Sequence, residues 1–186
     1  TVLCSEKGWL RAVKGHIEDT SEIRYKEGDH GRFVVHAHTT DKLIVLTTDG
    51  RFYTLACDRL PGGRGQGEPL RLMIDLGDEQ EPVAMLVHQP DRRLIVASSQ
   101  GRGFLIKEAD VIAQTRSGKQ VLNVITDEKA AACIVVPPDA DAIAIVGTNR
   151  RMLIVTLDEI PSMTRGRGVI LQRYREGRLA DILAFT

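Results

Sequence analysis

Three short segments combine glycine with basic residues, and this combination suits the binding of phosphate. They are residues 62–67, 115–119 and 164–168. Glycine lets backbone N–H groups approach an oxyanion closely, and a neighbouring guanidinium or ammonium group supplies the charge. On a nucleic acid, basic groups placed near the phosphates also release condensed counterions, which drives binding. The three segments therefore predict contacts with a phosphate backbone.

The candidate contact residues fall into three groups by position. The first candidates stand in the glycine-and-base segments: Arg64, Arg116, Lys119, Arg165 and Arg167. A second group lies near predicted hairpin tips: Lys7, Arg11, Lys14, Arg51, Arg102, Arg150 and Arg151. Arg173 and Arg175 alternate along a predicted strand and extend the same track. The competing interpretation is that these are solvated surface charges on ordinary blade connections. It fits any one arginine, whereas the recurrence at one position favours phosphate binding.

Other kinds of site chemistry find little support. His36 and His38 share one face of a predicted strand, and His88 is a candidate neighbour, but a metal site needs a third ligand and usually a carboxylate at fixed spacing. Ser98 and Asp49 have no neighbouring histidine that would activate a nucleophile. We therefore predict a chain with no catalytic residue, no metal and no cofactor of its own.

The charges balance overall but are segregated along the chain. The 25 basic and 25 acidic residues give zero net charge, which taken alone argues against nucleic acid binding. However, residues 150–178 hold seven arginines and three acids, whereas residues 75–91 hold five acids and no lysine or arginine. Arginine outnumbers lysine 18 to 7, and its forked donors match phosphate geometry. The acidic stretch favours a partner protein as a second possibility.

The three cysteines are far apart, and none belongs to a Cys-x-x-Cys pair. Zinc binding and dithiol chemistry are therefore poorly supported functions for them. We predict that Cys4, Cys57 and Cys133 are reduced core residues of a cytoplasmic protein.

The glycine-and-base segments recur at one position of an internal sequence repeat. Two apolar runs flank a small turn around residues 8, 50, 101 and 150, at intervals of 42, 51 and 49 residues. This is a β-hairpin pattern, because Gly and Asn tolerate the positive φ of such turns. After the last three hairpins come a glycine-and-base segment, a short strand and a final apolar strand. The short strands are predicted at 70–74, 121–125 and 169–171, and the final strands at 82–87, 131–136 and 179–185. The first unit keeps its hairpin and a final strand at 33–36.

Units of about 45 residues with four strands each are typical of propeller blades. We predict an all-β fold of about four four-stranded antiparallel blades in a single domain, residues 1–186. The repeats cover residues 1–38, 42–88, 93–136 and 142–186. Helical turns are predicted only near 58–61, 109–112 and 158–161.

Several motifs resemble one family. Residues 8–16, 60–70, 116–122 and 167–174 are similar, in order, to the C-terminal domain of the A subunit of bacterial topoisomerase IV. The resemblance runs nearly end to end and in register with the repeat. It implies a β-pinwheel, in which neighbouring blades exchange strands, and DNA lying over a basic outer rim.

The resemblance carries further expectations. It implies double-stranded DNA as a partner, together with the topoisomerase IV B subunit and a second A subunit in the full enzyme. ATP and Mg²⁺ would bind elsewhere, and the DNA-cleaving tyrosine would lie in a separate upstream domain. The isolated domain is expected to be monomeric and nucleoid-associated in the cytoplasm, as part of a family sometimes described as peripherally membrane-associated. A chromosome-associated protein is a further candidate partner.

Two alternatives stay open at this point. The related gyrase A C-terminal domain carries a Gln-Arg-Arg-Gly-Gly-Lys-Gly box for tight DNA wrapping, and residues 14–36 contain nothing like it. A protein-interaction propeller is the other alternative.

Only four units fit where the family usually has five or six blades. We therefore expect an open or broken ring and a further short unit beyond Thr186. The strand-like start at Thr1, without an initiator Met, leads us to expect a fragment of a longer chain.

Overall fold

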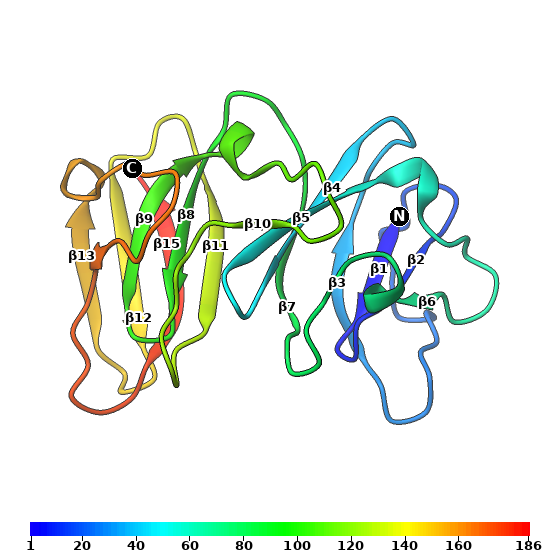
Figure 1. Cartoon of the computed structure of the whole chain (residues 1–186), viewed down its shortest axis with the longest axis horizontal. Coiled ribbons are helices and arrows are strands. Elements are labelled where there is room, and N and C mark those ends of the chain that lie inside the picture. Colours follow the sequence, from blue (N-terminus) through cyan, green and yellow to red (C-terminus); the bar gives the residue numbers. More distant parts are fainter.

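The computed structural model describes all 186 residues as fifteen strands and four short 3-10 helices. Figure 1 shows the strands grouped into upright sheets that follow one another from the first at one end to the last at the other. The first and last sheets lie apart, so the array is open. The predicted all-β pinwheel with an open ring is confirmed.

Each unit begins with a β-hairpin, as predicted. Its first strands are β1 (Val2–Ser5), β4 (Lys42–Thr47), β8 (Arg93–Ser98) and β12 (Ala142–Gly147). Its second strands are β2 (Trp9–Ala12), β5 (Arg51–Ala56), β9 (Arg102–Lys107) and β13 (Met152–Thr156). The first strand pairs on its other side with the last strand of its unit, antiparallel. These inner strands are β3 (Gly31–Val35), β7 (Pro82–Val87), β11 (Ala130–Val136) and β15 (Leu179–Phe185).

The fourth strand of a sheet comes from the next unit. The exchanged strands are β6 (Glu68–Pro69), β10 (Lys119–Gln120) and β14 (Val169–Ile170). They pair with β2, β5 and β9 of the preceding units. The sheet orders are β3-β1-β2-β6, β7-β4-β5-β10 and β11-β8-β9-β14, whereas the last sheet, β15-β12-β13, has three strands. We call each sheet a blade.

Two of the predicted short strands were wrong. Residues 70–74 and 121–125 lie after the exchanged strands, and the first of these segments includes the 3-10 helix η2 (Leu70–Leu72). Their leading N–H groups bond to the preceding hairpin tip: Leu70 N–H donates to the Gly8 carbonyl, and Val121 N–H donates to that of Gly50. Both side chains are buried, which explains the strand-like apolar pattern. The other 3-10 helices are η1 (Cys57–Arg59), η3 (Glu108–Val111) and η4 (Leu157–Glu159), close to the predicted turns.

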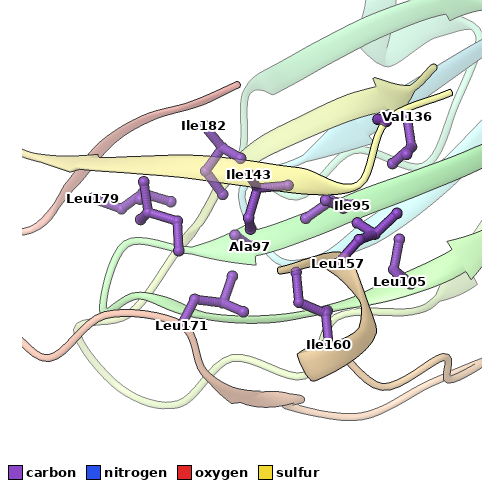
Figure 2. Close-up of a cluster of buried hydrophobic side chains, with 12 residues drawn as sticks. Ile95, Ala97, Leu105, Val136, Ile143, Leu157, Ile160, Leu171, Leu179 and Ile182 are labelled. Atoms are coloured by element: carbon purple, nitrogen blue, oxygen red, sulfur yellow. The ribbon is translucent and has the colours of Figure 1, made fainter. Parts of the chain in front are cut away.

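The core consists of three apolar clusters, one between each pair of neighbouring blades. Along β4, Leu43 faces the first blade and Ile44 faces the third, so this strand is buried on both faces. Figure 2 shows the cluster between the third and fourth blades, where Ile95 and Leu105 meet Ile143 and the other labelled side chains. Burial on both faces explains the continuous apolar runs of the middle blades. None of the helices is long and apolar enough to span a membrane.

Candidate nucleic-acid interface

The three glycine-and-base segments occupy the same place in successive blades. Each one leads directly into an exchanged strand, which is the outermost strand of its sheet. At the opposite edge, the inner strands contact one another in order, β3 with β7, β7 with β11, and β11 with β15. The basic segments therefore recur along the outer edge of the array. We call this edge the rim, and we call the segments 62–67, 115–118 and 164–168 the rim loops.

Each rim loop ends on a glycine that no other residue could replace without strain. These glycines have positive φ: Gly67 at 83°, Gly118 at 71° and Gly168 at 72°. A Cβ at Gly168 would lie 2.1 Å from the Gly103 carbonyl oxygen. Because positive φ costs an L-residue energy and the backbone cannot yield cheaply, glycine sets the turn that brings each loop against its neighbour.

Hydrogen bonds to the hairpin tips hold the exchanged strands in place. The Gly8 carbonyl accepts from Leu70 N–H at 2.8 Å, and the Gly50 carbonyl accepts from Val121 N–H at 3.1 Å. The Gly101 carbonyl accepts from Leu171 N–H at 2.7 Å. The terminal glycine and the bond to the tip carbonyl lie on either side of the exchanged strand, so together they hold that strand and the end of the loop that leads into it.

Two of the predicted rim arginines are exposed and unpaired. Arg64 and Arg165 stand at equivalent positions, four residues before the strand residues Glu68 and Val169 that follow the loop glycines. Neither arginine takes part in any of the seven ion pairs of the chain. Their guanidinium groups are therefore available to a ligand along the rim.

Arg116 in the middle rim loop and Lys119, which begins β10 directly after it, are partly engaged within the protein. Arg116 Nε lies 3.6 Å from Asp75 Oδ1, and its Nη2 donates to the Leu72 carbonyl at 2.9 Å. Lys119 Nζ donates to the Asp110 carbonyl at 2.6 Å. Arg116 and Lys119 remain exposed, and an exposed ion pair of this kind contributes little energy. Both side chains can still turn toward a ligand.

Arg167 points inward to a buried carboxylate. Its Nη2 lies 3.2 Å from Glu128 Oε2, and Ser98 Oγ donates to Glu128 Oε1 at 2.5 Å. Burial alone would raise the pKa of Glu128, but hydrogen bonds from Ser98 and from Ile125 N–H, together with the Arg167 charge, lower it below its usual value. Glu128 therefore anchors the third rim loop through Arg167. Sequence reasoning missed this residue, because it lies 39 positions from its partner.

Arginines near the hairpin tips brace the rim loops. Arg11 Nη1 donates to the Gly65 carbonyl at 2.5 Å, Arg51 Nη1 to Ser117 at 3.0 Å, and Arg102 Nη1 to Gly168 at 3.2 Å. Each bond joins one blade to the loop supplied by the next unit. The other tip residues are exposed and outside the ion pairs: Lys7, Lys14, Arg150 and Arg151.

The strand predicted around Arg173 and Arg175 was wrong in extent. β14 ends at Ile170, and residues 171–178 connect it to β15 without strand structure. The reason is the same as for the two earlier segments, because Leu171 N–H is bonded to the hairpin tip. Arg173 and Arg175 are exposed in this connection, and both line one surface hollow.

The histidines do not assemble as a ligand set. The ring of His36 lies 5.0 Å from that of His16, and the ring of His38 lies 5.6 Å from it. His88 is elsewhere, with Nδ1 2.9 Å from Glu108 Oε2. No group of three or more His, Cys, Asp or Glu side chains is arranged to hold a metal ion.

The cysteines are free thiols. Burial raises the pKa of Cys4 and of Cys133 to about 12, so both thiols stay protonated near neutral pH. Burial also raises the pKa of Cys57. A protonated thiol is a poor nucleophile and a poor metal ligand, so these side chains serve packing.

Comparisons with known proteins agree with this geometry. The family model described as DNA gyrase C-terminal domain, beta-propeller, matches residues 41–88, 92–137 and 141–185. The chain is 49% identical over 186 residues to the A subunit of DNA topoisomerase 4 of Caulobacter vibrioides, and 43% identical to that of Rickettsia bellii. All of the chain is covered, but only 24% and 25% of those relatives, so it spans about a quarter of their length.

Solved structures give the same result. The E. coli ParC C-terminal domain superposes with a TM-score of 0.88 at 27% identity, covering 98% of this chain and 78% of that one. A DNA gyrase A C-terminal domain, at 16% identity and a TM-score of 0.71, shares the fold, covering 98% of this chain and 64% of that one. With three matched repeats, exchanged strands and an open array, the chain belongs to the DNA gyrase C-terminal domain family of β-propellers.

Proposed function

We propose that this chain is the DNA-binding C-terminal domain of a topoisomerase IV A subunit. Its rim would bind and bend duplex DNA and present it to the strand-passage core of the enzyme. The observation that carries the proposal is the recurrence of basic loops at one edge of successive blades, with Arg64 and Arg165 exposed and free of carboxylates. The longer relatives, which are named as the A subunit of DNA topoisomerase 4, support it.

The chemistry of the rim suits backbone contact without base reading. Basic loops that recur along one edge would meet phosphates along a bent duplex, and such contacts position DNA independently of sequence. Arg116 and Lys119 supplement the two free arginines, with Lys7, Lys14, Arg150 and Arg151 beyond them. Arg11, Arg51, Arg102 and Arg167 hold the loops in place and contribute charge behind them.

The whole enzyme would supply everything else. Strand cleavage, ATP hydrolysis and Mg²⁺ binding would lie outside this chain, with the B subunit and a second A subunit completing the assembly. Decatenation, relaxation of supercoils and chromosome segregation would follow from strand passage. The domain would act at the nucleoid in the cytoplasm.

The test is a salt titration of duplex binding. We expect Arg64→Glu/Arg165→Glu to weaken binding and to reduce the slope of log K against log salt by about 1.8, that is about 0.9 for each lost phosphate contact. Lys42→Glu/Arg93→Glu is the matched control. It makes the same change of net charge, at equivalent exposed positions that begin β4 and β8 and belong to no rim loop.

Equal slopes in the rim variant and the wild type, with thermal unfolding unchanged, would contradict the rim assignment.

A protein-interaction propeller is the second candidate, and the acidic stretch 75–91 favours it. It predicts partner binding that changes little between low and physiological salt, if the contact is mostly apolar. Chiral wrapping in a topology assay would instead favour a gyrase-type domain.

A further inference from the structure

A surface hollow of about 610 Å³ lies where the exchanged strand β14 leaves the third blade and the chain enters the fourth. Three arginines line it: Arg102, Arg173 and Arg175. Tyr174 and Gln100 complete its polar wall, and no carboxylate belongs to the lining. None of the three arginines is in an ion pair. The hollow therefore gathers positive charge that the protein does not neutralise.

The segment that carries two of these arginines is fixed at both ends. Before Arg173, Gln172 N–H donates to the Gly101 carbonyl at 3.3 Å, next to the bond from Leu171. After Arg175, Thr148 N–H donates to the Arg178 carbonyl at 2.8 Å. The backbone of a segment held in this way loses little conformational entropy when a ligand binds.

Tyr174 locks the middle of the segment. A Cβ at Gly101 would lie 2.7 Å from the Tyr174 ring, and a Cβ at Gly147 would lie 2.5 Å from it. The ring therefore occupies space that two glycines, one in each blade, leave open. Its hydroxyl donates to Gln172 Oε1 at 2.7 Å. Because Tyr174 is held between the two blades, the backbone positions of its neighbours Arg173 and Arg175 are fixed as well.

Blade packing does not require this charge. At the preceding junction, Val121 and Leu122 bond to the Gly50 carbonyl as Leu171 and Gln172 bond to that of Gly101. Counting from these bonds, Asn123 and Ile125 occupy the positions of Arg173 and Arg175. The same connection is thus built without arginine one blade earlier. Packing therefore does not account for the two arginines at the junction of the third and fourth blades, and binding of an anionic ligand does.

We propose that Arg102, Arg173 and Arg175 form a site for one phosphate group, which on the proposed function is a backbone phosphate of the bound duplex. Guanidinium groups present planar, paired donors that match phosphate oxygens, and several of them around one group add charge and geometric specificity. The same chemistry would accept a free polyphosphate. This proposal rests on the proposed function only for the source of the phosphate.

The first arm of the test uses pyrophosphate at low ionic strength and follows the arginine Nε–H resonances by NMR. We expect the signals of Arg102, Arg173 and Arg175 to shift together with one dissociation constant. Arg173→Gln/Arg175→Gln should weaken the binding at least tenfold, because both substitutions remove charge-assisted hydrogen bonds to the phosphate. Lys42→Gln/Arg93→Gln should leave it unchanged. Absence of any shift in the wild type would overturn the site.

The second arm measures duplex binding against salt. If the arginines share one phosphate, Arg173→Gln should leave the slope almost unchanged, because Arg102 and Arg175 still neutralise that phosphate, whereas Arg102→Gln/Arg173→Gln/Arg175→Gln should reduce it by about 0.9. Independent contacts would already reduce the slope by about 0.9 in Arg173→Gln and would overturn the shared site. Pyrophosphate binding with an unchanged duplex slope in the triple variant would assign the site to a free polyphosphate.

The outcome separates this site from the rim. If the wild type binds duplex in a salt-dependent manner and Arg64→Glu/Arg165→Glu weakens that binding, the rim assignment is supported, whether or not the hollow binds phosphate. If the wild type fails to bind duplex, the proposed function falls, and the pyrophosphate arm still decides the site. Unchanged thermal unfolding of each variant shows that the fold is intact.

Discussion

The first three blades and the fourth begin with the same hairpin and differ at the outer edge. β2, β5 and β9 each pair with an exchanged strand, whereas β13 pairs only with β12. On β13, Met152 is 62% exposed and Ile154 is 55% exposed, while Leu105, at the position of Ile154 in β9, is 3% exposed. Leu183 extends this apolar face at 64% exposure, on the strand that pairs with the other side of β12.

This difference shows where the rim comes from. A rim loop exists only where the next unit delivers an exchanged strand, so the fourth blade has a hairpin tip but no rim loop on it. At that tip Arg150 adopts φ of 62° in the place that Gly50 and Gly101 take in the earlier blades. The binding edge is therefore a product of strand exchange rather than of the hairpins themselves.

The largest expected effect comes from breaking one exchange directly. Gly168→Ala should destabilise the domain by about 2–5 kcal/mol, the sum of positive φ and a clash with the backbone of Gly103. Gly65→Ala is the matched control, because Gly65 has φ of 78° with open space around it, and it should cost about 1–2 kcal/mol. Urea unfolding measures both, and equal losses would contradict the tight glycine joint.

An effect of similar size should distinguish the covered side chain of the third blade from the exposed one of the fourth. Leu105→Ala should lower the free energy of unfolding by about 2–5 kcal/mol, because it leaves a cavity between the third and fourth blades. Ile154→Ala, at the equivalent position of β13, should cost less than about 1 kcal/mol, since water already reaches that side chain. A comparable loss at both positions would mean that the fourth blade is covered in solution.

The smallest effect concerns the anchor of the third rim loop. Glu128 has a lowered pKa in the folded state, so its stabilising contribution is present above about pH 4.5 and is lost as the pH falls through the folded value. Glu128→Gln should cost about 1–3 kcal/mol at pH 7. It should also flatten the fall in stability below about pH 4.5. Unfolding midpoints measured from pH 7 to pH 3 test this, and parallel curves for variant and wild type would contradict it.

The sequence was sufficient to predict the blades. Turn residues at Gly8, Gly50 and Gly101, each between apolar runs, have a local cause, so the hairpins and the final strands could be predicted from neighbouring residues alone. The fourth hairpin, with Arg150 at its turn, followed from its spacing. Strand exchange came from the resemblance to a family and not from the residues.

The exchanged strands and the state of each arginine could not be predicted from the sequence, because both depend on pairing between residues far apart in the chain. The exchanged strands have only two residues each, and the apolar residues after them are buried by the hairpin tips, so the strands at 70–74 and 121–125 were predicted too late in the chain. Whether an arginine is free or engaged also depends on distant groups. Arg165 and Arg167 look alike in sequence, yet only Arg167 meets Glu128, through a contact across 39 residues.

The most direct test of the rim is site-specific photocrosslinking to one defined duplex. A photoreactive residue is placed in turn at 64, 115 and 165, and as controls at 90 and 139, in exposed turns between an inner strand and the next hairpin. We predict crosslinks from the three rim positions at separate points of the duplex, ordered as the blades are, with little from the controls. Crosslinks of equal yield from both sets, or rim crosslinks without order along the DNA, would contradict binding along the rim.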